Sequence, residues 1–557
     1  MSAKEINEIK AIAGSYNLEN YDQVKDTFEW EDAAKELSYF QTGKVNAAYE
    51  TIDRHVEEGY GDKIALHYIN GDERKSLTFN EVKHQTDHYA QVLKDHGVQK
   101  GDRVFVFLPK TPACYISILA VIKIGAIAGP LFEAFMEEAV KDRINDCKGT
   151  VLITDKELVK RVPQKDIPSL ETILFAEEID ALPQAPAKES LVEWVDLEDG
   201  LIIHYTSGST GKPKGVLHAH RSMIHHIISG KWVLDIQEDD VYWCTSHPGW
   251  VTGSVYGLFA PWLNRATIVI QGGRFKAENW YQLIAELKVT TWYSAPTAFR
   301  MLLSQGEIFK EYDLSSLRHI LSVGEPLNPE VIHWAWNNLG LRIHDTWWMT
   351  ETGGHLIVNL PNEKIKPGSM GRPFPGITVG ILDSEGNELP RGSVGQLAIR
   401  APWPGLMKEI WGNKDKFNSY FLYEGWYISG DLALQDEEGY VFFQGRSDDM
   451  INSAGERIGP FEVESKLIEH PAVSEAGVVG KPDPIRGEIV KAFITLRTGF
   501  VESEALLEEI RLFVRKNLSA HAAPREIEVV DELPKTKISG KILRRKLKEQ
   551  ELQKLHA

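Results

Sequence analysis

Short runs of apolar, β-branched and aromatic residues recur between helix-compatible stretches in the first half of the chain. They occupy residues 104–108, 151–154, 201–205, 267–270 and 290–293. Runs that are apolar on both faces are typical of strands covered by helices on both sides. Their alternation with amphipathic stretches such as residues 79–96 indicates βαβ units. We therefore expect an α/β fold built on parallel sheets.

The pattern changes beyond about residue 370. Strands at 379–382 and 396–400 are short and alternating, with Gly and Pro turns between them, which predicts a β-barrel-like subdomain at about 370–445. After GRSDD at 445–449, a helix at 460–469, strands at 476–479 and 490–496 and a helix at 502–518 predict a compact α+β domain. We expect a large domain of two βαβ-type sheets plus the barrel-like subdomain over residues 1–447, and a small mobile α+β domain over residues 449–557.

Charge and cysteine usage exclude several classes of protein. The 557 residues carry 62 basic and 80 acidic side chains, so the net charge of −18 disfavours nucleic acid and anionic membranes as partners. Cys114, Cys147 and Cys244 show no paired spacing, which argues against disulfides and zinc knuckles. Lys123 interrupts the apolar segment 115–132, and spanning a bilayer needs about 20 apolar residues. We expect a soluble, cytoplasmic protein.

A glycine-rich loop is the most informative local motif. Residues 205–215 read YTSGSTGKPKG and combine three glycines, four hydroxyl side chains and two lysines. Glycines let the backbone approach a phosphate, while hydroxyls, N–H groups and lysines supply donors. A P-loop of the form GxxxxGK[ST] fails here, because Thr206 replaces its first glycine and Pro213 its magnesium-binding hydroxyl. The loop is therefore a phosphate loop of another kind, and the alternative is a flexible surface turn.

Five segments in order resemble the signatures of the AMP-forming acyl-adenylating enzymes, the superfamily of acyl-CoA synthetases, luciferases and peptide-synthetase adenylation domains. They are YTSGSTGKPKG, DTWWMTETGG at 345–354, YISGD at 427–431, GRSDDMINSAGERIG at 445–459 and PKTKISGKILRR at 534–545. The resemblance implies an acid–thiol ligase that uses ATP, CoA and Mg²⁺. Acetate and ATP would give acetyl-AMP and pyrophosphate, and CoA would then give acetyl-CoA and AMP.

The resemblance also implies where the nucleotide and its metal bind. Glu351 matches the magnesium-binding glutamate, Thr350 the hydroxyl beside the α-phosphate, and Asp431 the ribose ligand. The remaining residues implied to bind ATP or AMP are Thr206, Ser207, Gly208, Ser209, Thr210, Gly211, Lys212, Gly324, Glu325, Pro326, Asp345, Thr346, Trp347, Trp348, Met349, Arg446 and Arg457. Read alone, a Thr–Glu pair is more often a helix cap than a metal site.

The acid-binding pocket implied by the resemblance ends at Trp348, the indole that shortens it in acetate-specific members. Val251, Thr252 and Val323 would form the remaining wall. Without the resemblance, Trp348 reads as a core aromatic. Discriminating acetate from propionate by one methylene is worth only about 1–3 kcal/mol. Acetate is the expected acid, and a short- or medium-chain acyl-CoA synthetase is the alternative.

In the C-terminal region the resemblance implies that Lys541 is the catalytic lysine, which contacts the reacting carboxylate and the α-phosphate. It also implies that Asp448 is the hinge between two domain orientations. A lysine acetyltransferase that acetylates Lys541 would remove the positive charge that adenylation needs, and a deacetylase would restore it. Ala454, Gly455 and Arg515 would contact CoA, and Ile468, His470 and Val473 would hold a second metal. Read without the resemblance, the basic tail is a solvated helix and Arg515 a surface residue.

Three rival functions stay open at this point. A carrier-protein adenylation domain, a non-catalytic nucleotide-binding relative and an unrelated NTPase would all bind ATP. The joint presence of Lys541, Glu351 and Asp431 favours a catalyst over a binding protein. Release of pyrophosphate that depends on a carboxylic acid would separate it from an NTPase.

Overall fold

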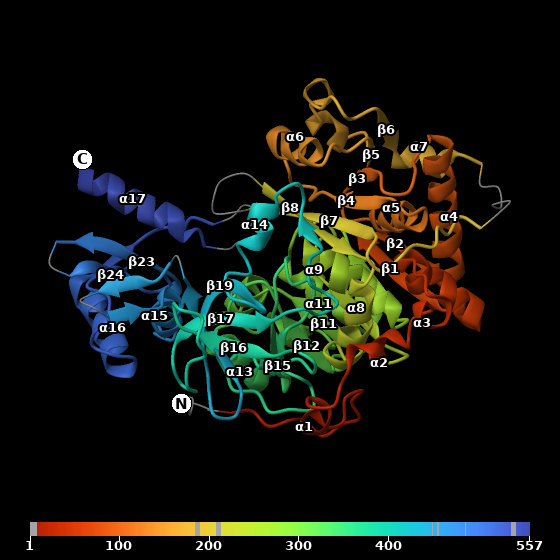
Figure 1. The fold of residues 1–557 in the computed structure, drawn as a ribbon. Coiled ribbons are helices and arrows are strands. Elements are labelled where there is room, and N and C mark those ends of the chain that lie inside the picture. The colour runs from red at the N-terminus through yellow and green to blue at the C-terminus, as the bar shows by residue number, and fades with distance from the viewer. Residues whose placement is uncertain are drawn as a thin grey trace.

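The computed structural model describes residues 8–183, 190–207, 213–447, 449–453, 456–484, 486–535 and 542–556. The expected fold class is confirmed: helices alternate with strands in two large, mainly parallel sheets, followed by an antiparallel sheet and a C-terminal α+β unit. In Figure 1 the C-terminal elements, coloured blue, lie to one side of the larger body, next to the region of β16 (Val379–Leu382) and β19 (Trp426–Gln435). The hinge at 448 and the barrel-like subdomain ending near 445 remain predictions.

The first sheet has its parallel strands in the order β7-β4-β3-β5-β6, and β8 and β18 add antiparallel strands at one edge. Its strands are β3 (Arg103–Phe107), β4 (Ile127–Pro130), β5 (Val151–Thr154), β6 (Thr172–Phe175), β7 (Gly200–Ser207), β8 (Pro213–Ala219) and β18 (Glu409–Ile410). The apolar segment 115–132 contains most of α5 (Pro112–Lys123) and all of β4. Both strand and helix are buried because helices cover both faces of this sheet.

The second sheet is parallel from β13 to β1, with antiparallel strands at both edges. Its strands are β1 (Ile64–Asn70), β2 (Glu73–Thr78), β9 (Val241–Cys244), β10 (Thr267–Gln271), β11 (Thr291–Ser294), β12 (His319–Ser322), β13 (Ile343–Trp347), β14 (Ile357–Val358) and β15 (Arg372–Pro373). Helices of the large body include α4 (Phe79–Asp95), α6 (Glu137–Asp146), α8 (Ser222–Trp232), α9 (Val251–Ser254), α11 (Ala277–Leu287), α12 (Pro296–Ser304), α13 (Pro329–Leu339) and α14 (Lys414–Asn418).

The antiparallel sheet consists of β16 (Val379–Leu382), β17 (Gly395–Arg400), β19 (Trp426–Gln435) and β20 (Val441–Arg446). The C-terminal unit contains β21 (Ile451–Ser453), β22 (Glu456–Ile458), β23 (Val473–Asp483), β24 (Gly487–Leu496), β25 (Glu526–Val529), α15 (Pro460–Ile468), α16 (Glu504–Asn517) and α17 (Arg544–His556). Its own hydrophobic cluster joins α15 and α16 to β23 and β24. The C-terminal unit therefore has a core of its own.

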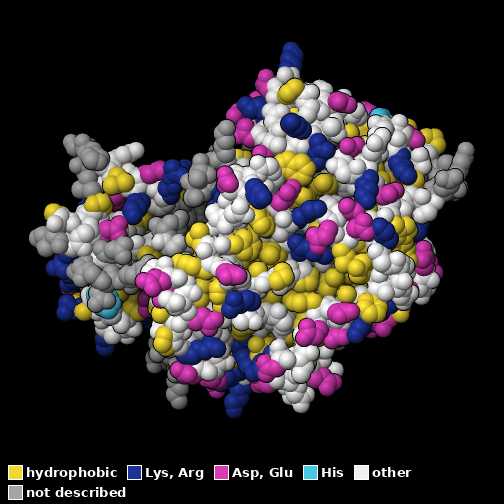
Figure 2. Space-filling model, viewed as in Figure 1, with side chains coloured by type: hydrophobic (Ala, Val, Ile, Leu, Met, Phe, Trp, Pro, Cys, Tyr) yellow, Lys and Arg dark blue, Asp and Glu magenta, His cyan; other side chains and the backbone are white. Residues whose placement is uncertain are grey.

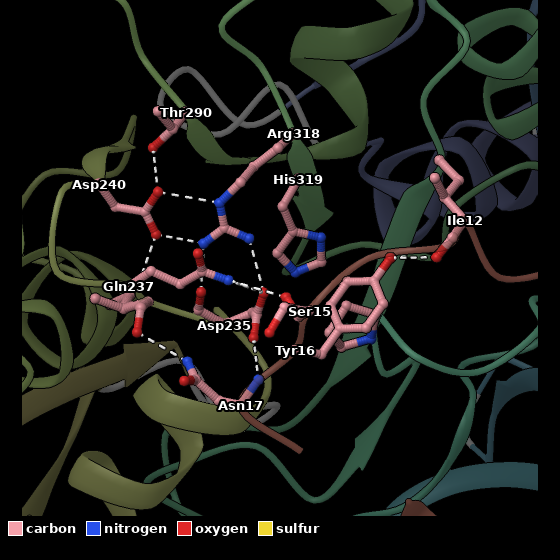
Figure 3. Close-up of polar contacts among 12 residues, drawn as sticks. Ile12, Ser15, Tyr16, Asn17, Asp235, Gln237, Asp240, Thr290, Arg318 and His319 are labelled. Atoms are coloured by element: carbon pink, nitrogen blue, oxygen red, sulfur yellow. Dashed lines mark hydrogen bonds and ion pairs between the residues drawn. The ribbon is translucent and has the colours of Figure 1, made fainter. Parts of the chain in front are cut away.

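A partly buried ion-pair network anchors the N-terminal segment to the second sheet (Figure 3). Arg318 forms ion pairs with Asp235, at 2.7 Å, and with Asp240. The other oxygen of the Asp235 carboxylate accepts the backbone N–H of Asn17 at 2.8 Å, and Asp240 accepts the hydroxyl of Thr290. The chain before α1 (Tyr21–Val24) is thus tied to a strand start some 300 residues later.

Lys123, which interrupts the apolar segment, is fully buried and paired. Its ammonium lies 2.9 Å from Asp53 and 2.6 Å from Asp87, so the buried charge is compensated on two sides. The three cysteines are free and buried, in agreement with the absence of a disulfide pattern. Along the described ranges, every helix is too short or too polar to cross a bilayer. On the face shown in Figure 2, acidic and basic side chains are interspersed.

Replacing Lys123 by methionine is expected to destabilise the large body by about 3–5 kcal/mol, because it removes the buried cation between Asp53 and Asp87 and leaves them only the more exposed Lys83. The thermal unfolding midpoint measured by calorimetry should fall by several degrees. Lys35→Met is the matched control, since Lys35 pairs with Asp32 on the solvent-exposed surface, and it should leave the midpoint unchanged. Equal midpoints for the two variants would contradict the assignment of Lys123 as a buried structural cation.

Candidate active site

Strand β13 divides the DTWW motif between two faces of its sheet. Successive side chains of a strand point to opposite faces, and the contacts follow that rule. The indole N–H of Trp347 donates to a carboxylate oxygen of Asp431 at 2.9 Å. On the other side, the hydroxyl of Thr346 lies 2.7 Å from the hydroxyl of Tyr293, to which the indole N–H of Trp348 donates at 3.3 Å. Neighbouring tryptophans therefore serve two separate regions.

Asp431 is a buried carboxylate whose orientation is fixed by two donors. It stands opposite Arg446 in the β19–β20 pair, and the Arg446 guanidinium donates to its second oxygen at 2.8 Å. Gly430 precedes it at φ +78°, and a Cβ there would lie 3.2 Å from the Arg446 guanidinium. A carboxylate held in this way presents fixed acceptors, as vicinal ribose hydroxyls require.

Asp345, the middle residue of β13, lies on the same strand face as Trp347 and is buried. Burial raises the pKa of its carboxyl well above the ordinary value. Within the described part of the chain, one of its carboxylate oxygens has no hydrogen-bond partner. A buried polar atom without a partner is rare, and it is an available acceptor for a ligand amino group.

Glu351 follows β13 and is also buried, with an exposed fraction of 7%. Its carboxylate accepts the hydroxyl of Tyr420 at 3.0 Å, and the Tyr420 ring stacks on Tyr427. Tyr427 in turn directs its hydroxyl to the sulfur of Met349 at 3.7 Å. Burial, followed by the negative charge of Glu351, raises the pKa of Tyr420, so Tyr420 is a hydrogen-bond donor at neutral pH.

A single buried carboxylate fits Mg²⁺, which proteins commonly bind through one or two carboxylates completed by phosphate oxygens and water. Among the described residues no cluster of three His, Cys, Asp or Glu side chains could hold a metal alone. Glu351 would therefore hold the ion together with the phosphates of a bound nucleotide.

Three buried histidines hold the segment that carries Glu351. The ring Nε2 atoms of His218, His225 and His226 lie 2.7–2.9 Å from the backbone oxygens of Thr350, His355 and Gly353, respectively. Burial lowers the pKa of His218 and His225 to about 4, so both rings are neutral and donate through Nε2. These positioning residues are absent from the sequence analysis, because they lie on β8 and α8 and share no single periodicity.

Gly353, in the same segment, admits no side chain. Its φ is +69°, and a Cβ at this position would lie 1.9 Å from the backbone oxygen of Gly405. The first glycine of the TETGG motif is therefore required for steric reasons, independently of any ligand.

The glycine-rich loop joins two paired strands rather than a strand and a helix. Thr206 pairs with Lys214 and Ser207 with Pro213 in the β7–β8 hairpin, and α8 begins only at Ser222. Gly208, Ser209, Thr210, Gly211 and Lys212 lie outside the described residues, as does the Ser207 side chain. Lys214, which was not among the expected site residues, interacts electrostatically with Lys416 and Glu351. Burial and Lys416 lower its pKa.

The SVGEP segment lies where the large body meets the C-terminal unit. Gly324 has φ +89°, and the carboxylate of Glu325 is bound by Thr297 and Arg300 at 2.8 Å. Glu325 and Pro326 line a cavity of about 60 Å³ together with residues of the C-terminal unit, among them Phe461, Glu464, Ile542 and Arg544. Residues of the large body and of the C-terminal unit thus meet at this cavity.

The residues expected to form the acid pocket pack in one hydrophobic cluster. Val323 and Trp348 are buried in it, and the half-buried Val251, the first residue of α9, packs against it. Thr252 follows in α9 and is half-buried. The cluster also contains Tyr256 and Tyr293, which touch Trp348 and were not among the expected site residues.

Several expected residues lie elsewhere or are not described. Arg515 is exposed in the last turn of α16. The residues expected to hold a second metal are Ile468, His470 and Val473. The Nδ1 atom of His470 accepts the backbone N–H of Ala472. The backbone oxygen of Val473 accepts the Nε–H of Arg497. Outside the described residues lie Asp448, Ala454, Gly455, Lys541 and the side chain of Arg457.

Comparison with known proteins agrees with these motifs. The family model "AMP-binding enzyme" matches residues 52–411, and the model "AMP-binding enzyme C-terminal domain" matches residues 462–541. The chain is 56% identical to "Acetyl-coenzyme A synthetase" of Bacillus subtilis strain 168, over 98% of each chain. It is 41% identical to the Rubrobacter xylanophilus protein of the same name, over 93% of this chain and 87% of the relative.

Solved structures show the same architecture. An acyl-CoA synthetase of Brucella canis matches with a TM-score of 0.75 at 34% identity, covering 97% of this chain and all of the other. An anthranilate CoA ligase in complex with anthranoyl-AMP matches with a TM-score of 0.84 at 31% identity, over 92% and 98% of the two chains. With two family models matched in order and relatives similar over nearly their whole length, the chain belongs to the AMP-binding enzyme family, the superfamily of acyl-adenylating enzymes.

Proposed function

We propose that this chain is an AMP-forming acetate–CoA ligase. Acetate attacks the α-phosphate of ATP to give acetyl-AMP and pyrophosphate, and CoA then takes the acetyl group and releases AMP. The observation that carries this is the division of β13, which sets the Trp347–Asp431 pair on one face and Trp348 on the other. Near full-length similarity to proteins named acetyl-coenzyme A synthetase supports acetate as the acid.

The chain's own residues have separate tasks in this reaction. Asp431, fixed by Trp347 and Arg446, accepts the ribose hydroxyls, and the free oxygen of Asp345 accepts the adenine amino group. The glycine-rich loop donates to the phosphates. Glu351, held by Tyr420, binds Mg²⁺, which neutralises phosphate charge when bound. Adenylation needs mainly positioning and charge neutralisation, which these groups supply.

We further propose that the C-terminal unit serves both half-reactions. Lys541 neutralises the carboxylate and α-phosphate during adenylation, and rotation about Asp448 then replaces it with Gly455 and Arg457, so that the thiol can enter. Ala454 and Arg515 contact CoA in that second orientation. Carbonyls of Ile468 and Val473 with His470 hold a second metal. Acetylation of Lys541 by an acetyltransferase, reversed by a deacetylase, switches off the first step in a cytoplasmic enzyme.

Exchange of labelled pyrophosphate into ATP tests the proposal. With acetate, propionate, butyrate and octanoate as the acids, kcat/KM for exchange should be highest with acetate and about 10–200-fold lower with propionate. Without any acid there should be no exchange. A maximum at butyrate or octanoate would favour the alternative, a short- or medium-chain acyl-CoA synthetase. Acid-independent release of orthophosphate would identify an NTPase instead.

A further inference from the structure

Trp348, at the proposed end of the acid pocket, is held by a buried network that is separate from the Trp347–Asp431 contact. It contains Tyr293 of β11, His355 and Tyr256, which lies in the π-helical turn Val255–Phe259. We propose that Tyr293, supported by His355 and Tyr256, is a specificity-determining positioning residue that fixes the Trp348 indole and thereby sets the length of acid that the enzyme accepts. The inference rests on the proposed function, because it concerns the acid used in that reaction.

The donors and acceptors of this network can be arranged in only one order. The hydroxyl of Thr346 donates to the backbone oxygen of Ser322 at 2.7 Å, so it accepts from the hydroxyl of Tyr293, also at 2.7 Å. The single proton of Tyr293 is therefore committed to Thr346. Its oxygen must accept from both remaining neighbours, the Trp348 indole N–H at 3.3 Å and the His355 Nε2–H at 3.0 Å.

The tautomer of His355 agrees with this order. The ring is fully buried, and burial lowers its pKa well below the ordinary value, so it is neutral. Its Nδ1 has no partner among the described residues, which is tolerable for an acceptor but not for a buried donor. The proton accordingly resides on Nε2 and points to Tyr293.

Tyr256 restrains the same indole from a second side. Its ring stacks on the His355 imidazole at 3.8 Å and 11°, and meets the Trp348 ring edge-on at 5.0 Å and 81°. Its hydroxyl accepts the backbone N–H of His355 at 2.7 Å and is hydrogen-bonded to Ser229 at 3.0 Å. Tyr256 itself is therefore held at its hydroxyl by two hydrogen bonds and at its ring by the stack on His355.

The consequence is a rigid end to the acid pocket. If the Trp348 indole rotated to admit a longer acid, its N–H would leave Tyr293 and become a buried donor without an acceptor, which is unfavourable. It would also press against the locked Tyr256 ring. Removing the Tyr293 hydroxyl eliminates the acceptor, so the indole loses its preferred orientation while its bulk stays in place.

Tyr293→Phe tests this inference in the full chain. We expect the ratio of kcat/KM for acetate over propionate, measured by pyrophosphate exchange, to fall about tenfold, within the range that one methylene spans. The KM for ATP should not change, because Trp347 and Asp431 lie on the other face of β13. Tyr281→Phe is the matched control: the Tyr281 hydroxyl is also buried and has no hydrogen-bond partner in the described part of the chain, so its loss should leave the ratio as in the wild type.

A second pair of variants tests the order of donors. Thr346→Val removes the acceptor of the Tyr293 proton and should lower the acetate-to-propionate ratio, whereas Thr346→Ser keeps a hydroxyl and should restore most of it. An unchanged ratio in Tyr293→Phe, with wild-type acetate preference, would overturn the role of Tyr293 and leave the proposed function standing. Absence of acid-dependent exchange in the wild type would instead overturn both.

Discussion

Replacing Lys541 by alanine is expected to slow acetyl-AMP formation by about 10²–10³-fold, the usual loss when one group that stabilises developing charge is removed. In the proposed reaction the ammonium neutralises charge shared by the carboxylate and the α-phosphate. Transfer of the acetyl group from supplied acetyl-AMP to CoA should stay near the wild-type rate, because that step forms no bond to phosphorus. Pyrophosphate exchange measures the first step, and acetyl-CoA formation from acetyl-AMP measures the second.

The surroundings of the next residue support this prediction. Ile542 lines the small cavity that Glu325 and Pro326 of the large body also line, so this end of the C-terminal unit adjoins a segment expected to bind the nucleotide. Lys548→Ala is a suitable control, since Lys548 lies on α17 and pairs with Glu488 within the C-terminal unit. Equal losses in the two half-reactions for Lys541→Ala would show that the lysine serves folding or domain position rather than adenylation.

Replacing Trp348 by glycine is expected to shift the acid preference from acetate to acids of four or more carbons. The indole is nearly buried between Tyr256, Tyr293 and His355, so its removal opens space in the hydrophobic cluster that these rings leave unfilled. One methylene is worth about 10–200-fold in kcat/KM, so butyrate should overtake acetate by at least one order of magnitude. Removing a buried tryptophan also costs about 3–5 kcal/mol of stability, so assays belong well below the unfolding temperature.

Trp347→Phe provides the contrast to Trp348→Gly. It removes the indole donor to Asp431 and should raise the KM for ATP while leaving the order of acids unchanged. A chain-length profile in Trp348→Gly that matches the wild type would remove Trp348 from the acid pocket. A changed profile in Trp347→Phe would contradict the division of the two faces.

Much of the fold could be predicted because parallel strands have a strong local signature. The runs at 104–108, 151–154 and 267–270 became β3, β5 and β10 within a residue or two, since both of their faces are covered. Strand β8 was missed. Its first residues are Pro213, Lys214 and Gly215, which locally favour a loop, and only pairing with β7 and the short β18 makes them a strand.

The residues of the site were likewise predicted only in part. The resemblance supplied Asp431, Glu351 and Trp348, but not the residues that hold them. Tyr420 comes from a segment almost 70 residues after Glu351, and Tyr293 precedes Trp348 by 55 residues. Contacts of this range leave no periodic signal in the sequence. The histidines that hold residues 350–355 resemble ordinary core residues until their backbone partners are known.

The alternation along β13 also bears on how such an enzyme can change over time. Because Trp347 contacts Asp431 and Trp348 contacts Tyr293 on the opposite side, a duplicated gene could change the proposed acid preference by substitutions around Trp348 while the proposed ATP site stayed as before. A one-residue insertion in the same strand would exchange the two sides and disable both at once. We therefore expect enzymes of this class to diversify by point substitutions, while the length of that strand stays constant.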